Sequence, residues 1–590
     1  MKLLLMAALM AALCCGAVYG RTKEDARALL TDPVVESLYA RTYASILERS
    51  EKDGFFLESV NGAYTGMFPR TVGALASLYE VTGETEKTRR HVDLVLKIAR
   101  DNNMRRCAHV IIRHPVTIKP GEGVIAGADM AVSRLDAPYM GCQYFRGAGK
   151  PVKAVYVYLA AATGSGTYHM TLSPDLEEEP LAVCDLSAED VKDGWVRFAF
   201  DKPCKTEKGR RYVVTLQALG GSGRPIWHGS ATEGPDSEIY AVGSDTDGEI
   251  WLHRRGIQMA FAADYGGNVK FDTRPRYAIL SRGDQVDGNL HVLAAWAMCA
   301  LADVDKAWEN RTYKQVAELV DTVMDLPYLS YRAPRVFPGL VKNHMFEHSR
   351  QGRYWDCWDI LTQSWALRTL ELMQQVAERR GDDKHREFWA KCEQELLANV
   401  HENLTFEVDG KKVYAEMRMA DSSDGTLLEG MSWANFGTIA SQYTGFDNTI
   451  LSDTLETYAR NARRDWHGHT VWAHEWDFGQ KMEISAVEGL PAGVVLPAYT
   501  GGRVSAQVIG KGVGWDLVWC ARTGNYDRIC DWLEFIRDEN STRLYAEAFN
   551  LINGETVIQD DGNGEQCAWW CWGMAVAREA CGLDPVPDVK

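Results

Sequence analysis

The run EHSRQGRYWDCWD at residues 347–359 mixes carboxylates, cations and large aromatic rings within a short span. A solvated loop has no need of two Trp, and a hydrophobic core excludes this many charges. Asp356, Asp359 and Gln363 follow the i, i+3, i+7 spacing, so a helix that begins here would carry all three on one face. Paired carboxylates can act as proton donor and base in glycosidic bond cleavage, and flat rings can stack on sugars. The run therefore predicts one wall of a sugar-cleaving pocket.

Carboxylates near Trp recur at two later points in the chain. Glu429 lies at the start of an expected helix over 428–443, and Glu565 begins the last expected helix, with Trp569, Trp570 and Trp572 behind it. A single acid in a first helical turn is often no more than a favourable partner for the helix dipole. Three acids at the starts of separate helices are better explained by a shared site. The catalytic candidates are Asp356, Asp359, Glu565 and Glu429.

Cations and aromatic side chains accompany these acids, and the chain as a whole is acidic. The substrate-binding candidates are His344, His348, Arg350, Arg353, Trp355, Trp358, His474, Glu475 and Arg543. An Arg fork pairs a carboxylate in a bidentate manner, so the cations favour an anionic sugar such as a terminal uronic acid. The alternative is that Arg350 and Arg353 only neutralise Glu347, Asp356 and Asp359.

Composition limits the class of partner. The chain has 590 residues and a formal net charge of −17, with 46% hydrophobic residues. A strongly acidic surface disfavours nucleic acid and anionic membranes. We therefore expect a carbohydrate substrate and no nucleic-acid partner, and the sequence does not indicate an oligomeric state.

The N-terminus MKLLLMAALMAALCCGAVYG has the pattern of a cleaved secretory signal over residues 1–20. Cys14 and Cys15 suggest a lipoprotein alternative, but the residues before them fit a lipobox poorly. We expect a secreted or periplasmic protein with no membrane segment after cleavage. Of the cysteines that remain, Cys184 and Cys204 are placed to bridge two strands of one β region, and their pairing stays open.

Periodicity divides the rest of the chain into three parts. Helical periodicity covers residues 21–104, alternation takes over at 105–272, and helices resume over 273–590. The middle part predicts an inserted β-sandwich, with strands at 153–159, 168–172, 194–200, 211–219, 238–243 and 257–262. Helices are expected at 24–51, 69–81, 84–101, 286–303, 307–326, 355–380, 383–400, 428–443, 448–464, 505–522, 525–538 and 566–581.

Four helix pairs are joined by similar short turns, in which a glycine ends the first helix. These glycines are Gly83, Gly381, Gly445 and Gly524, and each is predicted to adopt the left-handed conformation. The connections between hairpins are long, so they would all gather at one end of the helices. Twelve helices in six hairpins predict a mainly α fold, an (α/α)6 toroid with an inserted β-sandwich. An α-solenoid is the alternative, and uneven repeat lengths disfavour it.

The six hairpins, the WDIL run at 358–361 and the GEQ at 564–566 resemble the six-hairpin glycosidase superfamily, which includes glucoamylase-type enzymes and glucuronyl hydrolases. The resemblance covers residues 24–103 and 273–590. It implies a carboxylate after Trp as general acid, which fits Asp356 or Asp359, and Glu565 as general base in an inverting, exo-acting hydrolase. Asp in place of Glu as the acid resembles the glucuronyl hydrolases, and the inserted β-sandwich departs from the family pattern.

Three other possibilities stay open. His467, His469, His474, Glu475 and Asp477 could be a metal site, but the spacing matches no strong signature, and we expect neither metal nor other cofactor. A polysaccharide lyase could use Tyr354, His348 and Arg353, or Tyr545 and Arg543. A non-catalytic glycan-binding protein would need only the aromatic residues.

A position at the start of a helix affects the candidate base and the candidate acids differently. A helix N-terminus favours the charged form of a carboxylate, which suits Glu565 as a base. It opposes Asp356 or Asp359 as an acid unless burial beside Trp outweighs it, and Glu429 is the reserve candidate.

Overall fold

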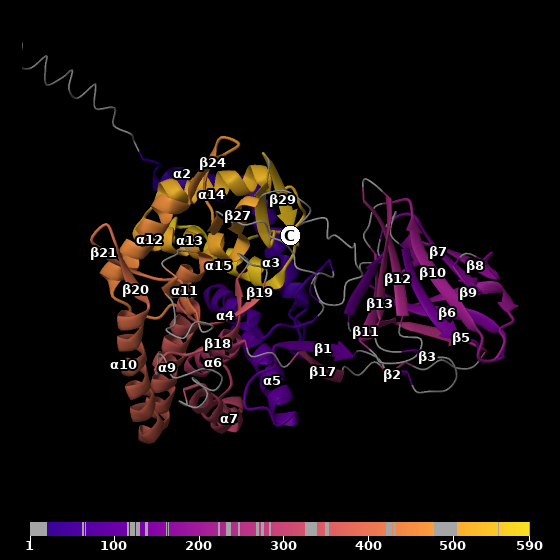
Figure 1. Cartoon of the computed structure of the whole chain (residues 1–590), viewed down its shortest axis with the longest axis horizontal. Coiled ribbons are helices and arrows are strands. Elements are labelled where there is room, and N and C mark those ends of the chain that lie inside the picture. The colour runs from indigo at the N-terminus through magenta and orange to yellow at the C-terminus, as the bar shows by residue number, and fades with distance from the viewer. Residues whose placement is uncertain are drawn as a thin grey trace, which may run out of the picture.

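The computed structural model describes residues 20–588 with internal gaps, and for some strands it describes the backbone only. The gaps are 62–63, 65, 115–116, 119–123, 126–129, 136–139, 161, 163, 177, 222–224, 232–237, 246–247, 256, 267–270, 273–275, 282–284, 325–338, 349–352, 420–426, 429–431, 477–503 and 553. The predicted signal over residues 1–20 lies outside the described residues, apart from Gly20. The chain is mainly helical, with several sheets (Figure 1).

Six largely buried helices form the centre of the helical part. They are α4 (Thr71–Thr82), α6 (Val286–Leu301), α9 (Ile360–Arg380), α11 (Gly437–Ala440), α13 (Gly510–Thr523) and α15 (Gly564–Ala580). They contact one another in chain order, and α15 returns to contact α4, so the contacts close into a cycle. Their surfaces are apolar on nearly all sides, as expected for helices that have neighbours all round.

A second set of helices covers the first. It consists of α2 (Lys23–Leu30), α3 (Pro33–Arg49), α5 (Thr85–Asp101), α7 (Lys306–Met324), α10 (Asp383–Asn403), α12 (Asn448–Ala462) and α14 (Tyr526–Glu539). Each exposes one face and buries the other, because its apolar residues recur with helical spacing. Within the described part of the chain, no helix is both long enough and apolar enough to cross a membrane.

The hairpin turns confirm three of the four glycine predictions. Gly83, Gly381 and Gly524 each follow an inner helix with a positive φ of 78°, 70° and 71°. The prediction for Gly445 is wrong, because the residue with positive φ after α11 is Gln442, at 58°. Gly445 instead packs against the Tyr443 hydroxyl, where a Cβ would collide.

Two of the predicted helices begin with a strand. Residues 353–359 form β19 (Arg353–Asp359), and residues 504–509 form β27 (Val504–Ile509). Pairing with other strands overrides the local helical pattern in both places. The remaining strands of the helical part are β18 (Asn343–His348), β20 (Thr405–Val408), β21 (Lys411–Tyr414), β22 (Met417–Met419), β23 (Leu427–Leu428), β24 (Arg463–Trp466), β25 (His469–Trp472), β26 (Glu475–Trp476), β28 (Ala548–Ile552) and β29 (Glu555–Gln559).

The strand at 353–359 changes the geometry that was expected for Asp356 and Asp359. Asp356 and Asp359 lie in β19, and α9 starts at Ile360, so the two acids and Gln363 do not share a helix face. The helix predicted over 428–443 is also shorter than expected. It consists of a 3-10 turn, η3 (Trp433–Phe436), followed by the single turn α11.

Two antiparallel sheets with their own hydrophobic core form the middle of the chain. A six-stranded sheet has the order β13-β12-β5-β10-β7-β8, and a seven-stranded sheet has the order β14-β11-β6-β15-β3, with β4 beside β11 and β9 beside β6. The strands are β3 (Val124–Ile125), β4 (Met130–Arg134), β5 (Met140–Arg146), β6 (Val152–Ala160), β7 (Thr167–Ser173), β8 (Ala182–Ser187), β9 (Gly194–Cys204), β10 (Arg211–Leu219), β11 (Ile226–Ala231), β12 (Glu238–Asp245), β13 (Gly248–Arg255), β14 (Ile257–Met259) and β15 (Phe261–Asp264). Five of the six predicted strands are confirmed, and the sixth, 257–262, is divided at residue 260 into β14 and β15. Cys184 and Cys204 are both free thiols, so they do not form the bridge considered above.

A two-stranded ribbon connects this β region to the helices (Figure 1). It pairs β1 (Val110–His114) with β17 (Arg276–Ser281), and β2 (Thr117–Ile118) pairs with β16 (Phe271–Asp272). The backbones of Ile111 and Met67 exchange two hydrogen bonds of 2.8 and 2.9 Å. Arg113 of the ribbon also pairs with Glu51. The ribbon thus ties down both ends of the loop between α3 and α4.

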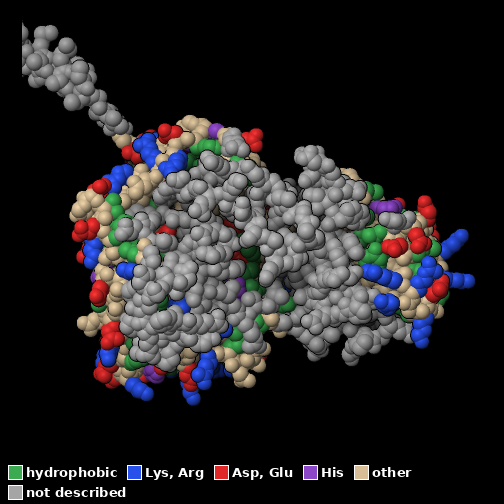
Figure 2. Space-filling view, viewed as in Figure 1, with side chains coloured by type: hydrophobic (Ala, Val, Ile, Leu, Met, Phe, Trp, Pro, Cys, Tyr) green, Lys and Arg blue, Asp and Glu red, His purple; other side chains and the backbone are tan. Residues whose placement is uncertain are grey.

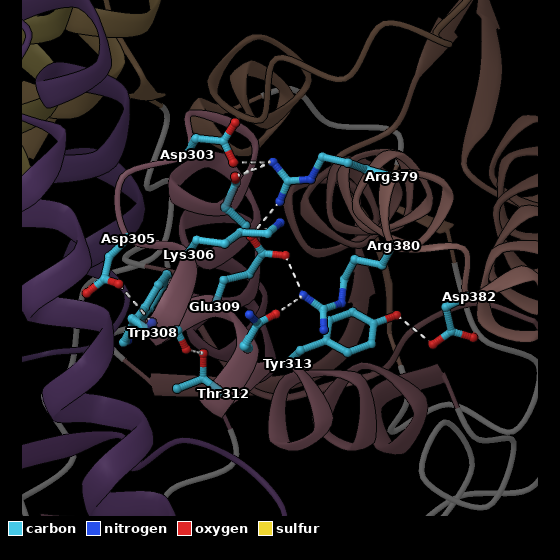
Figure 3. A network of polar contacts seen from close by, with 12 residues as sticks. Asp303, Asp305, Lys306, Trp308, Glu309, Thr312, Tyr313, Arg379, Arg380 and Asp382 are labelled. Carbon is cyan, nitrogen blue, oxygen red and sulfur yellow. Dashed lines mark hydrogen bonds and ion pairs between the residues drawn. The ribbon is translucent and has the colours of Figure 1, made fainter.

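A buried carboxylate lies at the other end of the helices, where α7 begins and α9 ends (Figure 3). Glu309 of α7 is 1% exposed and accepts hydrogen bonds of 2.6 Å from Arg379 and Arg380 and of 2.9 Å from Lys306. The two arginines end α9, so this cluster joins two neighbouring hairpins. Removing one partner of a buried ion pair leaves charges that are neither paired nor hydrated.

We therefore expect Glu309→Gln to lower the free energy of unfolding by about 3 kcal/mol, the low end for buried pairs because the cations are partly exposed. Urea denaturation at neutral pH measures this. Since the three cations lower the pKa of Glu309 despite its burial, the loss should diminish as the pH falls below the ordinary range of a carboxylate. A loss below about 1 kcal/mol would show that the cluster behaves like a surface ion pair.

Candidate active site

Charged side chains gather where the inner helices begin. Arg70 precedes α4, Asp287 lies in the first turn of α6, Asp359 caps α9, and Lys511 and Glu565 lie in the first turns of α13 and α15. Contacts among these side chains show that the N-termini of several inner helices meet at one place. The positive ends of the helix dipoles therefore converge on a group of carboxylates.

Glu565 is the centre of this group. Its Oε2 accepts a 2.8 Å hydrogen bond from Arg70 Nη2, and its Oε1 lies 3.6 Å from Lys511 Nζ. Burial alone would raise the pKa of Glu565, but the two cations outweigh it and lower the pKa to about 2. Lys511 is held in turn over the ring of Trp433, 4.1 Å from its centroid. Glu565 is thus an ionised carboxylate at neutral pH.

Glu58, from the loop before α4, lies directly beside Glu565. Its Oε1 accepts a 2.8 Å hydrogen bond from the backbone N–H of Glu565, and its Oε2 accepts one of 2.7 Å from the Thr71 hydroxyl. Burial, assisted by the negative charge of Glu565, raises the pKa of Glu58 to about 7, although these hydrogen bonds oppose the shift. Two adjacent carboxylates therefore have environments that move their pKa values in opposite directions.

A second carboxylate pair, Asp287 and Asp359, is linked by Asn343 and Thr362. Asn343 Nδ2 donates to Asp287 Oδ1 at 3.0 Å and to the Thr362 hydroxyl at 3.1 Å, and that hydroxyl donates to Asp359 Oδ2 at 2.7 Å. Asp287 Oδ2 also lies 3.8 Å from Arg70 Nη1. Because Arg70 pairs with Glu565 as well, it connects this carboxylate pair to Glu565. Burial and the charge of Asp287 raise the pKa of Asp359 to about 7, against the opposing hydrogen bond from the Thr362 N–H. Desolvation therefore outweighs the helix N-terminus at Asp359.

Aromatic rings from the inner helices pack against one another next to the charged layer. His291 of α6 lies 3.9 Å from Trp365 and 6.3 Å from Trp569, measured between ring centroids. Its Nδ1 hydrogen-bonds the Arg70 carbonyl at 2.6 Å, so Nδ1 carries the proton. Burial lowers the pKa of His291 to about 4, which leaves the ring neutral. Arg70 is therefore positioned through its backbone by His291 as well as through its side chain by Glu565.

Several predicted site residues have side chains outside the described part of the chain. Arg350 and Glu429 lie wholly outside it. Only the backbone is described for His344 and His348 in β18, for Arg353, Trp355 and Asp356 in β19, and for Glu475 in β26. Of the predicted catalytic residues, the structure therefore describes the side chains of Asp359 and Glu565.

Other residues that were predicted to contact a sugar have different positions in the structure. Trp358, Trp569, Trp570 and Trp572 are at most 2% exposed, so they belong to the core and present no open face for a sugar. His474 is completely buried, stacks on Trp532 and accepts a hydrogen bond from the Ile509 N–H, so it is a core histidine. Arg543 is exposed, and its carbonyl accepts a hydrogen bond from Arg41 of α3.

Asp477 lies outside the described residues, and the side chains of Glu475, His348, Arg353 and Tyr354 are not described. The other residues considered for metal binding or lysis have structural roles. His467 and His469 lie on the β24–β25 hairpin and pair with Glu539 and Asp538 at the end of α14. Tyr545 is fully buried and donates a hydrogen bond to the Gly510 carbonyl. Among the described residues, no cluster of three or more His, Cys, Asp or Glu is arranged to hold a metal ion.

Sequence reasoning missed four members of the group: Glu58, Arg70, Asp287 and Lys511. They come from three segments, since Glu58 and Arg70 share the loop before α4, and none is part of a run rich in charge and Trp. One signal was present, since all four lie within a loop before an inner helix or in its first turn, where Glu565 was recognised. Applying that rule to the starts of α4, α6 and α13 would have found three of them.

No protein-family model matches the chain, and no curated protein sequence matches it. Among solved structures, a protein described as a wild-type glycosidase is 10% identical, with 93% of this chain and 98% of that one covered and a TM-score of 0.43. A rhamnosidase from Klebsiella oxytoca with rhamnose bound is 11% identical, with coverage of 81% and 98% and a TM-score of 0.32. A metal-independent α-mannosidase from Streptococcus pneumoniae is 9% identical, with coverage of 52% and 70% and a TM-score of 0.36. These similarities are too low to assign a family or an activity.

Proposed function

We propose that this protein is a glycoside hydrolase that cleaves a glycosidic bond with a protonated and an ionised carboxylate. The observation that carries the proposal is the opposite shift of carboxylate pKa values at one end of the inner helices. Glu565 has its pKa lowered to about 2, while the pKa values of Asp359 and Glu58 are raised to about 7. Carboxylates that differ in protonation at neutral pH are what glycosidic cleavage requires.

In this mechanism Glu565 is the base and a buried Asp or Glu is the acid. The acid protonates the leaving oxygen while Glu565 accepts a proton from the attacking water, which inverts the anomeric centre. Asp359 is one of the two acids that the sequence predicts, together with Asp356, and its raised pKa supports that role. Glu58 is a further acid candidate, because it touches the backbone of Glu565. Asp356 and Glu429 stay sequence-based candidates.

The cyclic order of contacts among the six inner helices supports an (α/α)6 toroid of the six-hairpin glycosidase type. We further propose that the protein is exported by its N-terminal signal and acts on an oligosaccharide or polysaccharide outside the cytoplasm or in a periplasm. The catalytic residues would then lie at the end of the toroid where the long connections enter. An inserted β-sandwich would form a separate unit beside that toroid.

For the substrate we propose a glycan with a terminal uronic acid, removed in an exo-acting manner. The support is the sequence of the segment before α9, where Arg350, Arg353, His344 and His348 precede the candidate acid. The test compares hydrolysis of a uronate-capped oligosaccharide with that of its neutral analogue. Arg353→Ala should reduce activity on the uronate at least tenfold more than activity on the neutral sugar, because one bidentate charged contact is lost.

Arg460→Ala is the matched control, since Arg460 is exposed, pairs with Asp409 on the surface and is not a site candidate. Equal loss on both substrates would mean that Arg353 only neutralises neighbouring acids. Product analysis in the same assay separates the enzyme classes. An unsaturated uronate product would indicate a lyase, and tight glycan binding with no product would indicate a binding protein.

A further inference from the structure

Two neighbouring connections in the β region carry an unusual concentration of positive charge for such an acidic protein. Residues 146–153 connect β5 to β6, and residues 201–211 span the end of β9 and the start of β10. Together they contain eight cations, Arg146, Lys150, Lys153, Lys202, Lys205, Lys208, Arg210 and Arg211, and two acids, Asp201 and Glu207. All eight cations are exposed. Figure 2 shows Lys and Arg side chains (blue) on the side of the β region that lies away from the helical part, with acidic side chains (red) among them. We call these eight side chains the basic patch.

The two connections form one surface, because their backbones are joined. Gly147 N–H donates to the Arg210 carbonyl at 2.9 Å, and Gly209 N–H donates to the Gly147 carbonyl at 2.8 Å. The Thr206 hydroxyl donates to the Lys150 carbonyl at 2.8 Å. Arg146 and Arg211 are directly opposite each other across β5 and β10. The cations are therefore held near one another by a rigid framework, although like charges repel.

Few acids of the β region compensate this charge. Glu207 pairs with Arg210 at 2.8 Å, and Glu178 also acts on Arg210. Arg211 lies over the ring of Tyr144, 3.8 Å from its centroid. Within the described residues Lys202, Lys205 and Lys208 form no ion pair. A surface that keeps several unneutralised cations together is suited to an anionic partner with repeated charges.

We propose that the basic patch binds an anionic polysaccharide, and that the β region thereby holds polymeric substrate near the helical part. The choice of polysaccharide rests on the proposed function. Two properties of the protein favour a polysaccharide over a nucleic acid or an anionic membrane. The rest of the protein is strongly acidic, which opposes a nucleic acid of high charge density that extends beyond the patch. Neither connection contributes an exposed large hydrophobic residue of the kind that anchors a protein in a membrane interface.

The probe is polygalacturonate in native affinity gels, with dextran as the neutral polymer. The wild-type protein should be retarded by polygalacturonate and not by dextran, and salt should abolish the retardation. A K202E/K205E/K208E variant should bind at least tenfold more weakly. The matched control is K314E/K384E/K391E, which makes the same change of net charge on exposed lysines of α7 and α10. It should bind like the wild type, and circular dichroism melts verify that both variants are folded.

Equal weakening in both triple variants would overturn the proposal, since net charge alone would then explain binding. Absence of retardation, or stronger binding to DNA or to anionic lipid vesicles than to polygalacturonate, would also overturn it. Failure of the proposed function gives a different result. In that case no glycan is hydrolysed, but polygalacturonate still retards the wild type and the Glu565→Gln variant. Activity on a short oligosaccharide should be the same in wild type and both triple variants, because the patch lies outside the charged group at the inner helices.

Discussion

Glu565→Gln should reduce kcat for glycoside hydrolysis about a thousandfold, within the range that general acid–base catalysis contributes. The amide keeps the size of the side chain and can still accept a hydrogen bond from Arg70, but it cannot take a proton from water. It also places an N–H₂ group where the carboxylate lies 3.6 Å from Lys511. The substitution therefore removes the base and adds a local repulsion. Initial rates on a uronate-capped oligosaccharide, with KM determined separately, measure the effect.

Glu309→Gln is the matched control for this experiment. Both carboxylates are buried, both are paired with two or more cations, and both lie at helix ends. Glu309 is at the opposite end of the helices, so its substitution should lower stability and leave kcat per folded molecule unchanged. If Glu565→Gln retained more than about a tenth of wild-type activity, Glu565 would be a structural ion-pair partner and the proposed mechanism would be wrong.

The arrangement of charges explains how one end of the inner helices can hold carboxylates with very different pKa values. Every inner helix contributes partial positive charge at its N-terminus, which alone would ionise each carboxylate there. Cations reinforce this effect at Glu565, whereas Asp359 and Glu58 are buried next to other acids and with no cation in hydrogen-bonding distance of their carboxylates among the described residues. The difference in protonation therefore comes from the placement of Arg70 and Lys511. These two cations select which acid stays charged.

Much of the fold was predictable from local signals. The glycines at 83, 381 and 524 end helices because only glycine adopts the left-handed conformation without strain, and that requirement is visible in the sequence. The strands of the β region were found from alternation of apolar and polar residues. Gly445 was misassigned because its constraint is a contact with Tyr443, and a tertiary contact of that kind leaves no local pattern.

The strands before α9 and α13 were missed for a related reason. Residues 355–359 have aromatic and acidic side chains that suit either structure, and pairing of β19 with β18 and β22 decides between them. Only part of the charged group at the starts of the inner helices was predicted. Glu565 and Asp359 were identified from carboxylates near Trp, but those Trp side chains fill the core. Arg70 and Lys511 were not identified, because a single cation in a sequence shows no partner until the chain has folded.

Arg70→Met should destabilise the protein by about 3 kcal/mol at neutral pH, because it leaves Glu565 and Asp287 buried without their shared cation. The loss should depend on pH in a defined direction. The lowered pKa of Glu565, about 2, gives the wild type stability that is fully present above the ordinary pKa of a glutamate. That stability disappears as the pH falls through about 2. In the variant the pKa of Glu565 is no longer held so low, so this contribution is reduced at neutral pH.

The difference in unfolding free energy between wild type and Arg70→Met should therefore be largest above about pH 5 and shrink steadily toward pH 3. Urea denaturation at pH 7, 5, 4 and 3 measures it. Arg460→Met is the matched control, because Arg460 pairs with Asp409 on the surface with both side chains more than half exposed. Its effect should stay within about 1 kcal/mol at every pH. A loss for Arg70→Met that is the same at pH 3 and pH 7 would mean that Arg70 contributes through packing of its aliphatic chain. In that case the charge arrangement that keeps Glu565 ionised would not depend on Arg70, and Lys511 would have to maintain it alone.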